Sequence, residues 1–435
     1  MQEHDTPNTR AWVIHPDLKT DHTRRDAIPA LAEAVALAAA LPNLQVVGSD
    51  VVRLPKIHAG MLLGKGKIEE LRVIFEANEV ELVLIDGPVT PVQQRNLEKA
   101  WGVKLLDRTG LILEIFSDRA RTAEGVLQVE MAALSYQRTR LVRAWTHLER
   151  QRGGLGFVGG PGETQIEADR RAIDDQLNRL RKQMAKVVKT RELHRASRAK
   201  VPFPIVALVG YTNAGKSTLF NQLTQSKVYA ADQLFATLDP TLRKIQLQDV
   251  GAAILADTVG FIRHLPHDLI AAFKATLQET QQANLLLHVV DYSDDQFQEN
   301  TEQVNEVLEE IKADDIQQLV VCNKIDRMDG INAKIDRDES GMPIRVWVSA
   351  QQGVGIDLLY SAITECLSQN MVQHSLLIPP QHSNLRGVFF DMNCITSQDY
   401  AENGDWQVDV RMEQRDWNRL LKRIDVDLES YIIKH

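Results

Sequence analysis

The sequence predicts an α/β protein that contains more than one parallel sheet. Strand-like and helix-like segments alternate over residues 12–118 and again over residues 205–369, whereas residues 121–200 lack strand signals. Regular alternation favours parallel strands, because a parallel connection needs a crossover and the crossover is usually a helix. With 435 residues, the chain is long enough for several domains.

The first alternating region predicts an N-terminal α/β domain over residues 1–118. Short apolar runs typical of strands are separated by stretches with helical periodicity. The expected strands are Ala11–Ile14, Leu44–Val47, Glu81–Ile85 and Val103–Leu106, and the expected helices include Lys67–Ala77 and Pro91–Trp101.

Residues 119–200 predict an antiparallel helical hairpin with a glycine-rich tip. Apolar residues recur there at alternating four- and three-residue steps, which is the spacing of a narrow apolar stripe on a helix. The first stripe is Leu127, Met131, Leu134, Leu141, Trp145 and Leu148, with Arg138 filling its one polar step. The second is Ile166, Ile173, Leu177, Leu180, Met184 and Val187. The segment Gly153–Gly162 separates them and is too rich in glycine to be helical.

A second α/β domain is expected over residues 201–370, and a small α+β domain over residues 371–435. Two prolines in the linker Val201–Pro204 disfavour helix at the boundary. The larger domain has expected strands at Ile205–Val209, Ala253–Ala256, Leu285–Val290, Gln318–Cys322 and Arg345–Val348. In the tail, strands are expected at Gly387–Asp391 and Trp406–Val410, and a helix at Asp416–Arg423.

A phosphate-binding loop follows the first strand of the larger domain. The motif G-x-x-x-x-G-K-[ST] is matched by Gly210, Tyr211, Thr212, Asn213, Ala214, Gly215, Lys216 and Ser217, and Thr218 continues into a helical stretch. A strand before the motif and a helix after it are the context that this motif requires. Its glycines let main-chain amides converge on phosphate oxygens, with Lys216 expected at the β- and γ-phosphates and Ser217 on Mg²⁺.

A guanine-specificity motif follows another apolar strand. Asn323, Lys324 and Asp326 match N-K-x-D. Guanine presents two adjacent donors, its ring N1–H and its exocyclic amine, and one carboxylate accepts both, so Asp326 is the expected base-selecting residue. Ser349, Ala350 and Gln351 complete the expected base-binding set, with the Ala350 amide directed at the guanine carbonyl oxygen. The predicted ligands are therefore GTP and GDP.

Two further segments are expected to respond to the γ-phosphate. Asp257, Thr258, Val259 and Gly260 match D-x-x-G at the end of a strand, and Phe235, Ala236, Thr237, Leu238 and Asp239 lie between this motif and the phosphate loop. A threonine is needed there as a Mg²⁺ ligand, with Thr237 preferred and Thr241 as the alternative. The predicted metal ligands are Ser217, Thr237 and Asp257, and the predicted catalytic set is Lys216, Thr237 and Gly260.

The residue after the D-x-x-G motif predicts slow intrinsic hydrolysis. GTPases of the Ras type place a glutamine there to orient the attacking water, and this chain has Phe261. Another factor must then complete the site. Asn213 stands where cation-activated GTPases carry an asparagine that helps to hold K⁺, and an ordinary turn asparagine is the equally weighted alternative.

Charge indicates a local RNA contact on the hairpin. The whole chain carries −9, but residues 118–200 contain 18 Lys and Arg against 10 Asp and Glu, so the remaining residues carry −17. A basic projection with a glycine-rich tip favours binding to nucleic-acid phosphates. The candidate contact residues are Arg150, Arg152, Arg170 and Arg171. The alternative is a basic helical face that is only solvated. A second Gly-Lys turn, Gly64–Lys67, is interpreted as a plain turn before a helix.

Cysteine usage and hydropathy predict a cytoplasmic protein. Cys322, Cys366 and Cys394 are too few and too scattered for a disulfide framework or a metal cluster. The longest Ala/Leu-rich run, Leu31–Leu41, is too short to cross a bilayer, so no integral membrane association is expected. A monomer is expected.

The chain resembles the HflX family of GTPases. The resemblance rests on the blocks Gly64–Leu71, Pro161–Glu167, Gly210–Thr218, Phe235–Thr241, Asp257–Phe261 and Asn323–Asp326. It implies a Ras-like, doubly wound P-loop G domain, preceded by an α/β domain with a helical hairpin and followed by a small α+β domain. It also implies binding to the large (50S) ribosomal subunit and its rRNA, with GTP hydrolysis coupled to ribosome splitting or rescue under stress.

Two other classes of function stay open on the sequence. The protein is alternatively a GTP-gated ribosome-assembly or RNA-binding factor whose turnover is incidental. A P-loop ATPase or nucleic-acid remodeller is the other alternative, and the acidic Asp326 is poor support for it.

Overall fold

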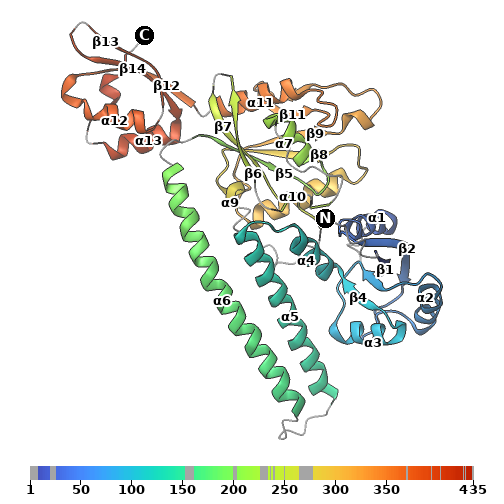
Figure 1. The fold of residues 1–435 in the computed structure, drawn as a ribbon. Helices are drawn as coiled ribbons and strands as arrows, with labels where there is room; N and C mark the ends of the chain where they lie inside the picture. Colours follow the sequence, from blue (N-terminus) through green and yellow to red (C-terminus); the bar gives the residue numbers. More distant parts are fainter. Residues whose placement is uncertain are drawn as a thin grey trace, which may run out of the picture. The chain divides into compact units, whose positions relative to one another are not determined.

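The computed structural model describes residues 8–19, 26–151, 161–198, 203–225, 234–235, 237–238, 241–248, 250–263, 278–368, 371–392, 394–401, 403–424, 426 and 428–433. The chain divides into two compact units (Figure 1). Unit 1 comprises residues 1–187, 229–240 and 259–277, and unit 2 comprises residues 188–228, 241–258 and 278–435. Within the described residues, no helix combines the length and apolarity that a membrane span requires.

Unit 1 begins with the predicted parallel sheet. Its strands are β1 (Thr9–Leu18), β2 (Leu44–Leu54), β3 (Leu82–Ile85) and β4 (Lys104–Asp107), in the order β2-β1-β3-β4 with every pair parallel. The accompanying helices are α1 (Ala27–Ala38), α2 (Lys65–Ala77), α3 (Pro91–Trp101) and α4 (Arg108–Arg119). The α/β prediction is confirmed. β2 is longer than expected because an edge strand tolerates polar residues such as Ser49 and Asp50.

Local sequence explains why α3 begins and ends where it does. Thr90 forms a capping box with Gln93, and Pro91 occupies the first helical position, where its missing N–H is not needed. Gly102 ends the helix in the left-handed region with φ 73°. The helix then buries Trp101, whose Nε1 donates to the Ile68 carbonyl of α2 at 3.0 Å.

The predicted hairpin consists of α5 (Ala123–Gln151) and α6 (Pro161–Arg198), which run antiparallel (Figure 1). Arg138 of α5 pairs with Asp174 of α6 at 2.8 Å. The α5 helix also contacts α3 and α4, so its buried side shifts from the predicted stripe to residues such as Val129 and Ala132. Residues 152–160, which include most of the predicted tip, lie outside the described part of the chain.

Unit 2 contains a seven-stranded sheet in the order β10-β11-β9-β8-β5-β7-β6. The strands are β5 (Ile205–Val209), β6 (Thr241–Leu247), β7 (Gly251–Asp257), β8 (Leu285–Asp291), β9 (Gln318–Asn323), β10 (Ile335–Arg337) and β11 (Pro343–Trp347). The edge strand β6 is antiparallel to its neighbour β7, and the edge strand β10 is antiparallel to its neighbour β11. The inner strands pair parallel. The helices described here are α7 (Lys216–Thr224), α9 (Gln278–Gln281), α10 (Phe297–Glu310) and α11 (Ile356–Ser368).

The tail of unit 2 forms a three-stranded antiparallel sheet in the order β12-β14-β13. Its elements are β12 (Met371–Ile378), η2 (Pro380–His382), α12 (Asn384–Asp391), β13 (Ile395–Tyr400), β14 (Trp406–Glu413), α13 (Gln414–Arg423) and η3 (Leu428–Tyr431). The strand expected at Gly387–Asp391 is wrong, because this segment is the second half of α12. Leu385 and Phe389 are both buried and four residues apart, which is a helical period.

Candidate functional site

The phosphate-loop motif connects β5 to α7 through two glycines that no other residue could replace without strain. Gly210 has φ 148°, and a Cβ built there would lie 2.2 Å from the Val289 carbonyl oxygen of β8. Gly215 has φ 94°, and its Cβ would lie 2.2 Å from Nδ2 of Asn323. The loop therefore packs tightly against β8 and against the end of β9. The N-terminus of α7 directly after it is a favourable position for an anion.

Lys216 is buried at the start of α7. Its Nζ donates to the carbonyl oxygens of Gly210 at 3.0 Å and Tyr211 at 2.7 Å, so the side chain folds back along the loop. Burial lowers the pKa of Lys216 to about 8, although the nearby carboxylate of Asp257 opposes this shift. A buried ammonium group of this kind is stabilised by an additional negative charge such as a phosphate.

Ser217, in the first turn of α7, and Asp257, the last residue of β7, bring two side-chain oxygen atoms together. The Ser217 hydroxyl donates to Oδ2 of Asp257 at 3.0 Å, and Asp257 is fully buried. The next residue, Thr258, donates through Oγ1 to the Leu208 carbonyl at 2.6 Å, which ties the end of β7 to β5. Hydroxyl and carboxylate oxygens are ligands that suit a hard cation such as Mg²⁺.

Asn323 joins the phosphate loop to the Ser349–Gln351 segment. Its Nδ2 donates to the Ala214 carbonyl at 2.8 Å, and its Oδ1 accepts from the Ala350 amide at 2.9 Å. The side chain is buried and therefore needs partners inside the protein, and main-chain groups of the predicted site supply them at both of its polar ends. Three sequence motifs that are far apart in the chain thus meet at one residue.

Asp326 lies in η1 (Ile325–Arg327) and is held by Ser349. The Ser349 hydroxyl donates to Oδ1 of Asp326 at 2.5 Å, and Oγ of Ser349 also accepts from the Gln352 amide at 3.1 Å. Lys324 has a left-handed φ of 65°, and its Nζ pairs with Asp291 at 2.7 Å. Asp326 is only partly buried, as a carboxylate that receives a ligand must be.

Asp291 joins the candidate site through its ion pair with Lys324, and it was not predicted from the sequence. It ends β8, so it lies at the carboxyl edge of the parallel sheet, where ligands bind in open α/β folds. The sequence signal that could have identified Asp291 is an acidic residue at the end of an apolar strand, because such a residue marks the carboxyl edge of the sheet.

Most of the predicted switch residues belong to unit 1, whereas Asp257 and Thr258 belong to unit 2. Phe235, Leu238, Val259, Gly260 and Phe261 are all buried there, and Thr237 is half-buried. Ala236 and Asp239 lie outside the described residues. The alternative threonine, Thr241, is instead the first residue of β6 and is the register partner of Asp257. The predicted metal ligands Ser217 and Asp257 are therefore in contact in unit 2, while Thr237 belongs to the other unit.

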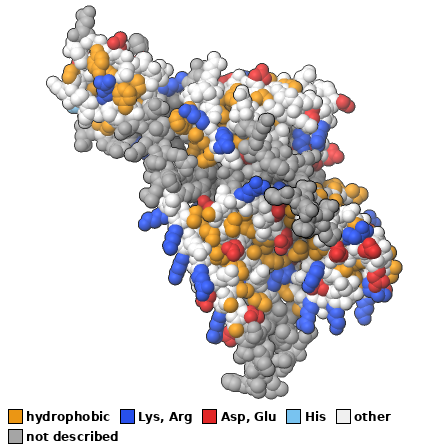
Figure 2. Space-filling model, in the orientation of Figure 1, with side chains coloured by type: hydrophobic (Ala, Val, Ile, Leu, Met, Phe, Trp, Pro, Cys, Tyr) orange, Lys and Arg blue, Asp and Glu red, His pale blue; other side chains and the backbone are white. Residues whose placement is uncertain are grey.

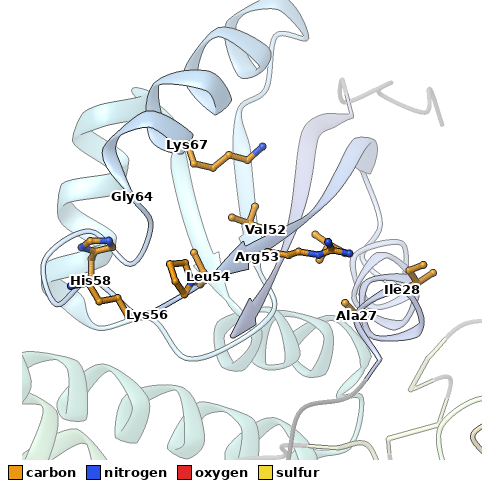
Figure 3. Close-up of a pocket in the computed structure, with 11 residues that line it drawn as sticks. Ala27, Ile28, Val52, Arg53, Leu54, Lys56, His58, Gly64 and Lys67 are labelled. Atoms are coloured by element: carbon orange, nitrogen blue, oxygen red, sulfur yellow. The ribbon is translucent and has the colours of Figure 1, made fainter. Parts of the chain in front are cut away.

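A cavity of about 530 Å³ lies in unit 1 beside the Gly64–Lys67 turn (Figure 3). Its labelled basic side chains are Arg53, Lys56, His58 and Lys67. Figure 3 shows them spread along the cavity, with Lys56 and His58 at one end and the tip of Arg53 toward Ala27 and Ile28. They do not converge on one point, as ligands of a single phosphate would.

The described part of α6 presents a basic exposed face. Figure 2 shows Lys and Arg side chains at intervals along the edge of the molecule that α6 occupies in Figure 1. Its exposed basic residues are Arg170, Arg171, Arg179, Arg181, Lys182, Lys186 and Lys189. Arg170 lies within 4.0 Å of Asp174, and Arg171 pairs with Glu167 at 2.8 Å.

Four family models match the chain in order. They are described as GTP-binding GTPase N-terminal (residues 29–117), GTP-binding GTPase Middle Region (residues 119–198), 50S ribosome-binding GTPase (residues 205–324) and HflX C-terminal domain (residues 334–429). A solved structure described as SsGBP in complex with GDP is 23% identical with a TM-score of 0.48, covering 83% of this chain and 99% of that one.

Curated relatives match over nearly the full length. GTPase HflX of Escherichia coli K12 is 53% identical over 402 residues, which are 92% of this chain and 93% of that protein. GTPase HflX of Magnetococcus marinus is 48% identical over 358 residues, or 82% of each chain. On this identity and coverage, and with the family models in the expected order, the chain belongs to the HflX family of GTPases.

Proposed function

We propose that the GTP state of this GTPase binds the large (50S) ribosomal subunit, and that hydrolysis stimulated by the ribosome is coupled to ribosome splitting or rescue under stress in the cytoplasm. The observation that carries the proposal is the match of residues 205–324 to the family described as 50S ribosome-binding GTPase. The basic exposed face of α6 supports it, because cationic side chains bind RNA phosphates and release their counterions.

The chemistry proposed for the site needs little covalent help from the protein. Mg²⁺, when bound, would neutralise charge on the β- and γ-phosphates, and Ser217 and Asp257 have the oxygen donors to hold it. Thr237 is proposed as a further ligand that engages only in the GTP state. Lys216 stabilises negative charge on the transferred phosphoryl group, and the Gly260 amide responds to its presence.

Selection of guanine is proposed to depend on Asp326. Its carboxylate accepts from N1–H and from the exocyclic amine, while the bond from Ser349 fixes its orientation. Because Ser349 also accepts from the Gln352 amide, the donor that orients the carboxylate is itself anchored to the main chain.

Basal hydrolysis is proposed to be slow because Phe261 occupies the position at which Ras-type GTPases place a water-orienting glutamine. Phe261 is 4% exposed and its side chain has no hydrogen-bonding group. Completion by the ribosome is the principal proposal. K⁺ is a secondary one, since Asn213 holds a left-handed φ of 61° in the phosphate loop and its side chain is a suitable oxygen donor.

The test is GTP turnover by the purified protein, with and without isolated large ribosomal subunits, in K⁺ and in Na⁺ buffer, with ATP as the control substrate. We expect low basal GTP hydrolysis, a rise of at least about tenfold with the subunit, and no ATP turnover. Binding without stimulation would favour the RNA-binding assembly factor, and equal rates in K⁺ and Na⁺ would remove the potassium proposal.

A charge variant of the hairpin sharpens the same assay. Arg170→Gln/Arg171→Gln removes two exposed positive charges from α6, so subunit binding should weaken and its dependence on salt should flatten. The matched control is Lys334→Gln/Arg337→Gln, which removes two charges that are 56% and 40% exposed outside the hairpin. Equal affinity of the two variants for the subunit would indicate that the basic face of α6 is only solvated and does not contact RNA.

A further inference from the structure

Arg108 makes three charge-assisted hydrogen bonds from a buried position at the start of α4. Nη1 donates to Asp86 at 2.6 Å, and Nη2 donates to Glu33 at 2.5 Å. Nη2 also donates to the main-chain carbonyl of Arg263 at 3.0 Å. The side chain is only 5% exposed, so these bonds form in a site from which water is largely excluded.

The Arg263 carbonyl belongs to the segment that follows the D-x-x-G motif. Arg263 is the third residue after Gly260, and Phe261, Ile262 and Arg263 are all buried. Three residues span at most about 10 Å of chain. A fixed carbonyl at Arg263 therefore restricts the positions that the Gly260 amide can adopt.

The same helix contacts the other predicted switch segment. Phe116, two turns further along α4, meets the ring of Phe235 edge to face with centroids 4.7 Å apart. Phe235 is 2% exposed and lies two residues before Thr237. One helix of unit 1 thus contacts Phe235 in one of the segments that are expected to respond to the γ-phosphate, and Arg263 shortly after the other.

The base of α4 is itself firmly held. Asp107 caps the helix by accepting from the Gly110 amide at 2.8 Å. The same carboxylate accepts from the Tyr136 hydroxyl at 2.6 Å and from Nη1 of Arg140 at 3.2 Å, both on α5. The hairpin helix therefore fixes the main chain directly before Arg108.

We propose that Arg108 is a positioning residue for GTP hydrolysis, which acts through the Arg263 carbonyl to fix the segment that follows Gly260. It begins α4 in the N-terminal α/β region and belongs to none of the GTPase motifs. The proposal rests on the GTPase activity of the family and not on the ribosome as partner, so it is tested on the isolated protein.

Two variants remove the bond to Arg263 in different ways. Arg108→Lys keeps the charge, but an ammonium group lacks the planar fork that reaches three acceptors at once. The triple variant Arg108→Met/Glu33→Gln/Asp86→Asn removes the donor without leaving buried carboxylates unpaired, which protects folding. The matched control is Arg119→Met on the same helix, which removes a bond of the same type, from Nη2 to the Ala40 carbonyl at 3.1 Å.

Intrinsic kcat for GTP should fall about tenfold in both Arg108 variants, because the segment that follows Gly260 is no longer held. Affinity for GDP should change less than about twofold, because GDP lacks the γ-phosphate to which this segment responds. Amide hydrogen exchange in residues 261–263 should accelerate without a matching change in the phosphate loop. Arg119→Met should retain the parent kcat. Unchanged kcat in the folded triple variant, or a loss of GDP affinity as large as the loss of kcat, would overturn the proposal.

Discussion

Two turns in this chain combine glycine with lysine at the start of a helix, and their surroundings differ. In the turn before α7, Gly210 and Gly215 have positive φ angles of 148° and 94°, and a Cβ at either position would collide with a neighbouring strand residue. At the start of α2, a Cβ at Gly64 or Gly66 would meet no atom within 4 Å, and neither glycine has a positive φ. Only the first turn depends on glycine for its conformation.

The lysines of the two turns differ in the same way. Lys216 is buried against two carbonyl groups, whereas the side chain of Lys67 is 30% exposed and pairs with Glu70 one turn later. A buried cation among main-chain groups is costly unless a ligand compensates it, but an exposed i,i+3 pair is ordinary helix stabilisation. Close packing and strain, rather than the residue types, therefore distinguish a phosphate loop from a plain turn.

The largest expected effect follows from Gly215→Ala. The substitution strains a left-handed φ and drives a methyl group into Asn323, whose two bonds to Ala214 and Ala350 join the loop to the base-binding segment. We expect GDP and GTP affinity to fall at least about 100-fold, or roughly 3 kcal/mol, from strain and lost hydrogen bonds together. Calorimetric titration with GDP measures it.

Gly64→Ala is the matched control for that variant. Gly64 precedes a lysine and a helix as Gly215 does, but its φ is −72° and the space around it is open. GDP affinity should therefore stay at the parent value. Equal losses of affinity in the two variants would contradict the distinction between the turns.

A smaller but more selective effect is expected from Asp326→Asn. The asparagine Oδ1 can still accept from the Ser349 hydroxyl, so the local fold should persist. The amide nitrogen, however, faces the guanine donors with donors of its own, which should cost about 100-fold in GTP affinity. Xanthosine triphosphate presents an acceptor there, so the variant should prefer it to GTP when the two nucleotides compete. Unchanged preference for GTP would refute base selection by Asp326.

The sequence predicted the local context of the candidate nucleotide-binding motifs well, because each is a short segment next to a regular element. Gly210–Ser217 follows a strand and precedes a helix, and Asn323 ends a strand, as the structure has them. Strand β6 was not predicted, because its exposed residues Arg243, Lys244 and Gln246 hide the two buried apolar ones. The five-residue run Gly387–Asp391 was assigned to a strand because it is too short to reveal a period of 3.6 residues.

The contacts of Arg108 were beyond sequence reasoning for a different reason. Its partners Glu33, Asp86 and Arg263 are 75, 22 and 155 residues away in the chain and form no motif. Only the folded positions of α1, β3 and α4 bring them together. The grouping of residues 229–240 and 259–277 with unit 1 is likewise a property of tertiary packing, which no local pattern encodes.

The smallest expected effect is that of Gly66→Ala, and it tests the other half of the comparison. Gly66 is the second residue of α2, and a methyl group there would meet no atom within 4 Å. Alanine restricts the unfolded chain more than glycine does, so unfolding free energy should rise by about 0.5 kcal/mol with nucleotide binding unchanged. Denaturant unfolding and GDP titration measure both quantities. If Gly66→Ala instead weakened binding of a nucleotide or of RNA, a ligand would have to approach this main chain closely. The turn before α2 would then share the role of the turn before α7 without sharing its strain.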